Sequence, residues 1–446
     1  MGRALCTDFY ELNMAASYLR RGMTAPATFS LFVRRLPPRR GFLVAAGIED
    51  CVEWLEGFGF DEGDLGYLAG LGFEERDLEA LAGLRFTGEL WAIPEGRVVF
   101  AGEPLLELTA PLPEAQLAET FLLNQVTFQT ALASKAARCR LAAGEAMELV
   151  EFGFRRTHGV DAAMAAARGA AIAGFAGTSN VEAARRFGLR ASGTMAHSYV
   201  ESFPSELDAF RAFASDLPER AIFLVDTYDT ATGVRRAVRV IGELGLGRRA
   251  GIRIDSGDLV AVSREARALL DQAGLTEVRI FVSGGLDEGD LAALVTAGAP
   301  VDAAGVGTRL GVSADAPYLD SVYKLVAYDG RPVMKLSTGK ETAPGAKQVF
   351  RRPGLDDCIG LRQEEVPPGA EALLSPVMTG GRRLAAPPTA AQAVRSARDR
   401  FVRDVAELPS AAGRLEDPEA PAPARSAALE DLTAEVRARH QQAGGD

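Results

Sequence analysis

Three short stretches in the second half of the chain decide the fold: Gly251-Ile-Arg-Ile-Asp-Ser-Gly-Asp258, Val278-Arg-Ile-Phe-Val-Ser-Gly-Gly285 and Val301-Asp-Ala-Ala-Gly-Val-Gly-Thr308. Each begins with an apolar or β-branched run and ends in Gly, Ser, Thr or Asp, as a strand does when a ligand-holding turn follows it. Segments of helical length separate the three stretches, which predicts parallel strands. Ligands bind at the carboxyl ends of such strands. Together the stretches predict an α/β barrel built around a phosphate-bearing ligand.

The rest of the chain predicts further domains, because 446 residues are long for one core. A strand, turn and helix rhythm begins near residue 147, and no GxGxxG follows the first strand, so a dinucleotide-binding fold loses support. We expect four parts: an N-terminal α+β domain with a small antiparallel sheet (1–143), the barrel (144–320), strands that return to the N-terminal sheet (321–355) and a Pro/Ala-rich, helical extension (356–446).

Composition excludes several classes of protein. A formal net charge of −11 disfavours nucleic-acid binding, which requires a basic surface. No run approaches the roughly twenty apolar residues of a membrane span, and the N-terminus lacks the apolar core of a signal peptide. Four scattered cysteines indicate neither a zinc site nor a disulfide framework. We therefore expect a cytoplasmic protein. Basic residues near candidate turns leave room for an anionic small ligand: Arg138, Arg140, Arg155, Arg156, Arg253, Lys335, Lys340 and Lys347.

Two carboxylates follow the apolar run Ile222-Phe-Leu-Val225. Asp226 and Asp229 could hold Mg²⁺ or ribose hydroxyls. The alternative is helix capping, which fits Asp229 at least as well, whereas Asp226 at the tip of a buried strand favours function.

Arg253 and Asp255 alternate along one strand, so both side chains are expected on the same face. A charged pair inside a barrel needs partners or a ligand. A mutual structural salt bridge is the alternative, but Ser256-Gly-Asp258 follows at once and favours a ligand site.

Glycine turns and a histidine add to this picture. Gly285 and Gly307 lie in turns that could bring backbone N–H groups to an anion, although glycine could simply supply positive φ there. His197 follows a Gly-Thr turn, where imidazole could act as acid, base or nucleophile. The adjacent Arg155 and Arg156 suit a pyrophosphate or a carboxylate, with a solvated basic surface as the alternative.

Taken in order, these motifs closely resemble the nicotinate phosphoribosyltransferase family. The resemblance runs from about residue 7 to about residue 352, and it rests on the following motifs: Thr7-Asp-Phe-Tyr-Glu-Leu-Asn-Met14, Glu151-Phe-Gly-Phe-Arg-Arg156, Gly193-Thr-Met-Ala-His-Ser198, Asp226-Thr-Tyr-Asp-Thr230, Arg253-Ile-Asp-Ser-Gly257 and Lys335-Leu-Ser before Thr342-Ala-Pro-Gly-Ala-Lys347.

The resemblance implies a type II phosphoribosyltransferase: an irregular (β/α) barrel with an N-terminal α+β domain, in a homodimer with the active site at the subunit interface. It also implies a reaction of NAD salvage that joins nicotinate to 5-phosphoribosyl 1-diphosphate (PRPP), with Mg²⁺, and with coupled ATP hydrolysis through a phosphohistidine. The Asp226 run also resembles the PRPP motif of type I phosphoribosyltransferases, but three later strand-turn units leave no room for their compact doubly wound sheet.

The same resemblance assigns roles to individual residues. Tyr10 is similar to the aromatic residue that stacks on nicotinate, Arg253 to the group that reads its carboxylate, and His197 to the phosphorylated histidine. Thr194 matches another substrate contact, and Thr342 falls in a segment associated with PRPP. Position in similar turns gives weaker assignments for Arg138, Arg155, Asp226, Asp255, Gly285 and Gly307.

Two alternative functions stay open. One is another pyridine phosphoribosyltransferase, acting on nicotinamide or quinolinate. The other is a non-catalytic phosphate-binding barrel, which would keep the glycine turns but could lose Tyr10, His197 and Arg253; all three are present.

Overall fold

The computed structural model describes residues 4–337 and 341–443 and divides the chain into two compact units. Unit 1 comprises residues 1–134, 318–389 and 399–446, and unit 2 comprises residues 135–317 and 390–398. Lys340 lies outside the described residues.

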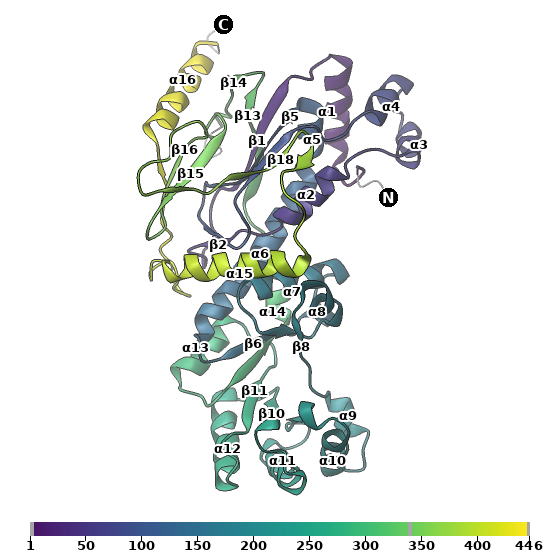
Figure 1. Cartoon of the computed structure of the whole chain (residues 1–446), viewed down its shortest axis with the longest axis vertical. Coiled ribbons are helices and arrows are strands. Elements are labelled where there is room, and N and C mark those ends of the chain that lie inside the picture. Colours follow the sequence, from purple (N-terminus) through teal and green to yellow (C-terminus); the bar gives the residue numbers. More distant parts are fainter. Residues whose placement is uncertain (1–3, 338–340, 444–446) are drawn as a thin grey trace. The chain divides into compact units, whose positions relative to one another are not determined.

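Unit 2 is built on one parallel sheet, as the three strand-turn stretches predict (Figure 1). Within the described residues the sheet has seven strands and its two edge strands do not pair with each other, so it forms a curled half-barrel. In spatial order the strands are β8 (Arg190–Ala191), β7 (Gly177–Thr178), β6 (Glu148–Glu151), β12 (Ala303–Val306), β11 (Arg279–Val282), β10 (Gly251–Ile254) and β9 (Ile222–Leu224).

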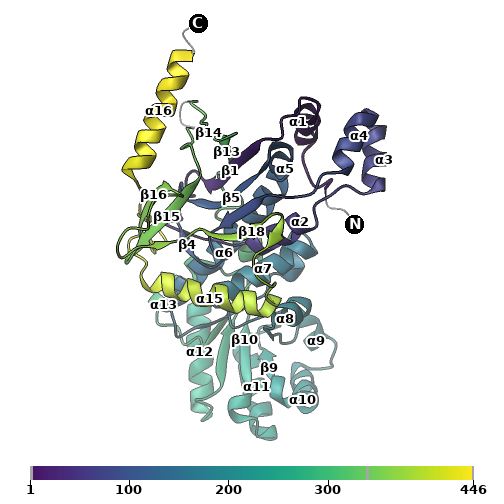
Figure 2. The ribbon, with the colours of Figure 1, turned by 45° about the horizontal axis from the view of Figure 1, so that its top comes forward.

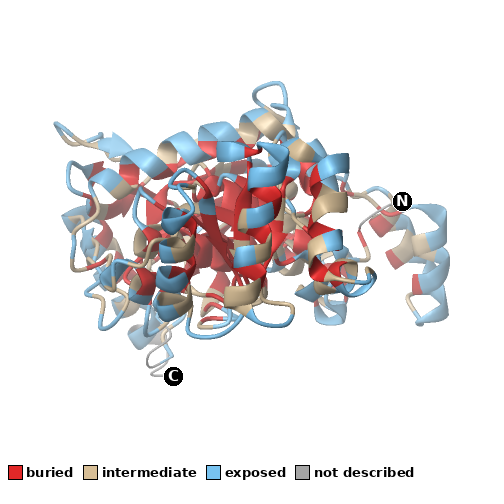
Figure 3. Ribbon diagram, turned by 90° about the horizontal axis from the view of Figure 1, so that it is seen from below, coloured by how far each residue is buried: buried red, intermediate tan, exposed pale blue. Residues whose placement is uncertain are grey.

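Helices follow these strands, and their polar caps explain where they begin. Asp229, Asp258 and Asp287 accept hydrogen bonds from backbone N–H groups in the first turns of α11, α12 and α13. Buried residues gather on the strands and exposed ones on outward helix faces (Figure 3), and Figure 2 shows α10, α11 and α12 beside β9 and β10. The helices of unit 2 are α7 (Val160–Ile172), α8 (Val181–Phe187), α9 (His197–Glu201), α10 (Glu206–Asp216), α11 (Thr230–Leu244), α12 (Leu259–Gln272), α13 (Glu288–Thr296) and α14 (Thr308–Gly311).

Unit 1 contains an antiparallel sheet whose strands differ in length. In it β13 pairs with β1, so a strand from beyond residue 320 joins the N-terminal sheet. Asp329 and Gly330, both at positive φ, turn the chain between β13 and the short β14. The strand order is β14 (Arg331–Pro332), β13 (Ser321–Tyr328), β1 (Pro26–Val33), β5 (Pro104–Pro111), β3 (Glu89–Ala92), β18 (Ser375–Thr379) and β19 (Arg382–Arg383).

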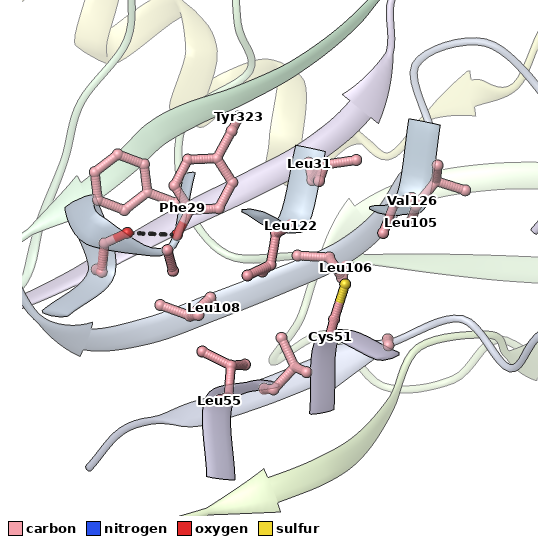
Figure 4. Packing of buried hydrophobic residues seen from close by; sticks show 14 of the residues in the cluster. Phe29, Leu31, Cys51, Leu55, Leu105, Leu106, Leu108, Leu122, Val126 and Tyr323 are labelled. Atoms are coloured by element: carbon pink, nitrogen blue, oxygen red, sulfur yellow. Dashed lines mark hydrogen bonds between the residues drawn. The ribbon is translucent and has the colours of Figure 1, made fainter. Parts of the chain in front are cut away.

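The core of unit 1 lies against this sheet (Figure 4). Phe29 and Tyr323 stack with ring centroids 4.6 Å apart, and the Tyr323 hydroxyl donates to the Ala115 carbonyl over 2.8 Å, which satisfies its buried polar group. The helices of the first 143 residues are α1 (Phe9–Arg20), α2 (Ile48–Glu56), α3 (Glu62–Gly70), α4 (Glu75–Ala82), α5 (Leu112–Leu117) and α6 (Glu119–Ala143).

The segment after residue 355 contains more sheet than the sequence indicates. β18 extends the first sheet, and a second sheet forms around β15 and β16. The strands of this second sheet are short, so they lack the long alternation of apolar and polar residues that would predict them. The second sheet contains β17 (Glu371–Ala372), β15 (Lys347–Arg352), β16 (Asp356–Leu361) and β20 (Ala424–Arg425). The segment ends in two helices, as expected: α15 (Ala390–Ala406) and α16 (Ala427–Ala443). Earlier in the chain, β2 (Leu43–Val44) pairs with β4 (Val98–Val99).

Candidate active site

Polar candidates of unit 2 lie where the parallel strands end. Thr194 follows β8, Asp226 follows β9, and Asp255 follows β10. Carboxyl ends of parallel strands share one edge of a sheet, so residues far apart in the sequence come together there.

Arg253 is the centre of this edge. Its side chain is only 11% exposed, and within the described residues four of its five N–H groups have partners. The remaining N–H is on Nη2. The guanidinium donates from Nε to Ser283 Oγ (2.8 Å), from Nη1 to Thr194 Oγ1 (2.9 Å) and the Met195 carbonyl (3.3 Å), and from Nη2 to Asp255 Oδ1 (2.8 Å).

Asp255 is held as a carboxylate. Burial opposes its ionisation, but the hydrogen bond from Ser283 and the charge of Arg253 outweigh burial and lower the pKa of Asp255. The mutual salt bridge that the sequence left as an alternative is therefore present. It is part of a larger network, because Arg253 also contacts Thr194 from another strand end.

Asp226 joins the network through one oxygen of its carboxylate. Its Oδ2 accepts from the Asp255 backbone N–H (2.9 Å) and from Ser256 Oγ (2.6 Å). Its Oδ1 is buried and has no hydrogen-bond partner among residues 4–337 and 341–443. Asp229 instead caps α11 by accepting from the Thr232 N–H (2.9 Å), so the capping interpretation is confirmed for Asp229.

His197 faces the same carboxylate. Its Nδ1 lies 3.1 Å from Thr227 Oγ1, and its Nε2 lies 4.0 Å from Asp255 Oδ2. The imidazole is 42% exposed, so a ligand can reach it. The structure thus gathers His197, Thr194, Arg253, Asp255 and Asp226 into one polar cluster.

The turn after β11 needs glycine for its backbone angles. Gly284 and Gly285 have φ of +106° and +79°. A Cβ on Gly284 would overlap the Asp255 carbonyl oxygen, whereas a Cβ on Gly285 would meet nothing within 4 Å. The open space at Gly285 leaves its backbone accessible.

The turn after β12 needs glycine for close packing instead. Gly307 has φ of −132°, so the alternative interpretation, that this glycine supplies positive φ, is wrong there. A Cβ on Gly305 would lie 2.6 Å from the Phe152 ring, and one on Gly307 would lie 2.6 Å from the Phe152 carbonyl oxygen. Both glycines let the β6 turn pack against β12.

A cavity of about 260 Å³ adjoins these turns. Its walls come from the β10 and β11 turns, from helices α12 and α13, and from Arg309 of α14. The lining residues are Gly257, Asp258, Leu259, Val260, Gly284, Gly285, Leu286, Asp290, Ala293, Leu294 and Arg309.

The turn after β6 supplies residues that sequence reasoning missed. Phe152 lies with its ring centroid 5.7 Å from the Arg253 guanidinium carbon and 5.5 Å from the Phe281 ring. Glu151 accepts hydrogen bonds from Thr178 Oγ1 and the Gly153 N–H, and burial raises its pKa. Phe152 stands inside the Glu151–Arg156 motif, so the motif itself was the available signal; Ser283 likewise stands inside the Val278–Gly285 stretch.

Arg155 is exposed in the 3₁₀ turn Phe154–Arg156, and it makes no ion pair with any residue that the structure describes. An exposed guanidinium agrees both with an anion-binding role and with a solvated basic surface, so the two interpretations of this basic pair stay open.

Arg138 does not lie at a turn. It is buried in α6, where its Nε lies 3.1 Å from Glu288 Oε1. The expectation that Lys347 lies near an anion-binding turn is also wrong, because its ammonium is buried 3.1 Å from Glu107 Oε1. Sequence position gives no warning of such burial.

Tyr10 and Thr342 belong to unit 1. Tyr10 is 47% exposed in the first turn of α1, and burial with the neighbouring Glu119 and Glu11 charges raises its pKa, so it stays a neutral phenol. Thr342 is buried, and its hydroxyl has no hydrogen-bond partner in the described part of the chain. The predicted roles of both residues stay predictions.

The described residues contain neither a cluster of metal-binding side chains nor a membrane-spanning helix. No three His, Cys, Asp or Glu residues among those described lie close enough to hold a metal ion by themselves. No described helix is long and apolar enough to cross a membrane.

Comparison with known proteins shows the family of the chain. Residues 5–127 match the nicotinate phosphoribosyltransferase N-terminal domain, and residues 147–352 match the nicotinate phosphoribosyltransferase family. The chain is 48% identical over 421 residues to nicotinate phosphoribosyltransferase pncB2 of Mycobacterium tuberculosis, covering 93% of this chain and 89% of that protein. It is 47% identical over 358 residues to the Bacillus subtilis nicotinate phosphoribosyltransferase, covering 78% and 73%.

Solved structures show the same architecture. The crystal structure of human nicotinic acid phosphoribosyltransferase aligns with a TM-score of 0.83 at 30% identity, covering 96% of this chain and 99% of that one. Nicotinate-nucleotide pyrophosphorylase from Pyrococcus furiosus aligns with a TM-score of 0.75 at 26% identity, covering 91% and 95%. These coverages reach past residue 355, so the C-terminal segment has counterparts in relatives.

The curled parallel sheet, with its polar cluster at the strand ends, defines a phosphoribosyltransferase of the architecture expected from the sequence. The chain belongs to the nicotinate phosphoribosyltransferase family.

Proposed function

We propose that this protein joins nicotinate to PRPP, giving nicotinate mononucleotide and pyrophosphate, with ATP hydrolysis coupled through a phosphohistidine at His197. The observation that carries the proposal is the polar cluster of unit 2. There, Arg253 is poised beside Thr194 on one side and Asp255 on the other.

Nicotinate fits this cluster through its carboxylate. Arg253 keeps one Nη2 hydrogen without a partner among the described residues, and Thr194 carries a hydroxyl beside Nη1. A charge-assisted hydrogen bond from Arg253 would hold a carboxylate in one orientation. Nicotinamide is neutral and would gain less from it.

The reaction breaks the bond between ribose C1 and the diphosphate oxygen and forms a bond from C1 to the pyridine nitrogen. Positive charge develops at C1 as the diphosphate departs. Asp226 and Asp255 place carboxylates at the strand ends, where they would stabilise that charge. Arg155 and the glycine turns would hold the anionic ends of PRPP.

Mg²⁺ fits this donor set. The buried Asp226 Oδ1 lacks a hydrogen-bond partner among the described residues, and carboxylate oxygen is a preferred magnesium ligand. Magnesium is usually held by one or two carboxylates together with substrate phosphates, which agrees with the lack of a three-residue metal cluster among the described residues. When bound, it would neutralise charge on the departing diphosphate.

ATP would transfer its γ-phosphoryl group to a ring nitrogen of His197 and leave as ADP. Water would later release phosphate and restore the imidazole. The exposed ring and the hydroxyl of Thr227 at 3.1 Å support this role, because both reach and orientation are required of a nucleophilic histidine.

Pyrophosphate release tests the reaction. The wild-type protein with PRPP, ATP and Mg²⁺ should release pyrophosphate faster with nicotinate than with nicotinamide or quinolinate. Preference for either of the other pyridines would replace the substrate assignment. No release from folded protein would favour the non-catalytic barrel.

Radiolabelled γ-phosphate tests the coupling. ATP should label the wild-type protein and His440→Ala, a control in the C-terminal helix, but should leave His197→Ala unlabelled. Equal labelling of the two variants would remove the phosphohistidine from the mechanism.

The homodimer, with a site completed at the subunit interface, is part of the proposal, as is a cytoplasmic location. The exposed Tyr10 supports a shared site, because its ring is free to reach a ligand. Mixing inactive Tyr10→Ala with inactive His197→Ala should restore part of the activity if each site takes residues from two chains. Sedimentation as a monomer would contradict the dimer, and cell fractionation tests the location.

A further inference from the structure

The glycine turns after β11 and β12 are each followed, within a few residues, by a buried carboxylate. After the β11 turn, Glu288 opens α13, and after the β12 turn, Asp315 follows α14. Both carboxylates point to the same helix. Lys135 and Arg138, from α6, meet them there, and we call these four residues the ion-pair cluster.

The contacts within the ion-pair cluster bridge the two paths. The Lys135 ammonium contacts Glu288 Oε2 and lies 3.0 Å from Asp315 Oδ1. The Arg138 Nε lies 3.1 Å from Glu288 Oε1 and 4.0 Å from Asp315 Oδ2. All four side chains are less than 10% exposed. Two cations of one helix thus hold one carboxylate from beyond each glycine turn.

A second link joins the same two paths nearer the surface. Arg309, in α14, donates to Asp287 Oδ2 over 2.6 Å and to Asp290 Oδ2 over 3.2 Å. Arg309 and Asp290 also line the cavity beside Gly285. Two sets of ion pairs therefore join the segments after the β11 and β12 turns. One set is the buried ion-pair cluster, and the other is Arg309 with Asp287 and Asp290.

Stability alone is a weak reason for this arrangement. Buried ion pairs lose so much hydration that apolar residues of similar volume are often as stable or more stable. Charged pairs with short contacts to two segments can instead fix the spacing between the groups they join, as buried polar residues do in some other proteins.

We propose that the ion-pair cluster is a positioning device that sets the spacing between the Gly284–Gly285 turn and the Gly305–Thr308 turn for the phosphate-bearing end of PRPP. The proposal rests on the proposed function, in which those turns hold PRPP. Under this proposal Arg138 holds Glu288 in place, instead of making the predicted contact with the substrate.

Two variants separate positioning from stability. Lys135→Met/Glu288→Met removes the central pair without leaving either charge alone, and Glu288→Gln removes one charge while keeping the shape. We expect both to raise the PRPP dissociation constant by about tenfold, because small misplacements of binding groups cost this much or more. The nicotinate KM should stay within about twofold of wild type, as its polar partners are elsewhere.

The matched control is Arg351→Met/Asp357→Leu, a buried bidentate pair in unit 1 with side chains at most 3% exposed. It should change the melting temperature without changing PRPP binding. Titration calorimetry with PRPP measures the dissociation constant without requiring turnover, and thermal unfolding reports whether each variant folds.

Each outcome of the binding and unfolding measurements either supports or overturns the positioning role. Loss of PRPP affinity in a double variant that melts like wild type supports the proposal. Wild-type PRPP affinity in folded Lys135→Met/Glu288→Met overturns it, and so does an equal loss in the control. If Lys135→Met/Glu288→Met does not fold, Glu288→Gln decides: a loss of PRPP affinity in that folded variant supports the proposal, and unchanged affinity ends it. If the wild type binds PRPP but does not turn over nicotinate, the proposed function fails while the positioning role stands.

Discussion

Arg253→Ala is the perturbation whose effect the structure fixes most closely. The guanidinium is 11% exposed and oriented by Ser283, Thr194 and Asp255, so the Nη2 hydrogen that has no partner among the described residues is held in one direction. A hydrogen bond to a charged group is worth about 1.5–3 kcal/mol. Loss of one such bond should raise the nicotinate KM by about 10- to 150-fold.

The kcat should fall much less than the KM rises, because the carboxylate is remote from the bond that forms and is held equally in the ground and transition states. Arg253→Lys should fail similarly, since an ammonium cannot reproduce the fork that Ser283, Thr194 and Asp255 orient.

Steady-state pyrophosphate release with nicotinate and with nicotinamide is the assay, and thermal unfolding of each variant is the control for folding. Nicotinamide lacks the carboxylate, so its KM should change little. An unchanged nicotinate KM, or an equal rise for both pyridines, would refute the role of Arg253 in reading the carboxylate.

Two further predictions concern stability. Gly285→Ala should lower the free energy of unfolding by about 1–2 kcal/mol because of its positive φ, whereas Gly284→Ala should cost roughly 3 kcal/mol or more because its Cβ would also overlap the Asp255 carbonyl; equal losses in denaturant titrations would contradict the described turn. Burial, with repulsion from Glu119, raises the pKa of Glu11 to about 7. The folded protein therefore binds the Glu11 proton more tightly than the unfolded chain does, and stability should fall by about 3 kcal/mol as the pH rises from about 4 to 8. Glu11→Gln should flatten this fall, and a pH dependence identical to wild type would count against the buried carboxyl.

The sequence predicted the structure best where a strand pattern and the charged residues of the site occur in the same stretch. The stretch Gly251–Asp258 combines an apolar strand with charged residues that alternate along it, and this combination predicted both the parallel sheet and the facing of Arg253 and Asp255. His197 could be placed beyond a strand end because a Gly-Thr turn precedes it.

It was least informative where partners come from distant segments. Arg138 looks like any helical arginine until Glu288, 150 residues away, is known to lie beside it. Gly307 looks like a turn glycine, but the reason for glycine is the Phe152 carbonyl that packs against it. The strands after residue 355 are too short to show periodicity, and they form because strands from earlier in the chain, such as β15 and β3, pair with them.

A crystal structure of the protein with nicotinate bound tests the central claim most directly. We expect the pyridine ring beside the strand ends of unit 2, with its carboxylate within about 2.7–3.2 Å of the Arg253 guanidinium and its ring nitrogen turned away from Arg253. Nicotinate bound elsewhere, or with its carboxylate turned towards solvent, would contradict the account.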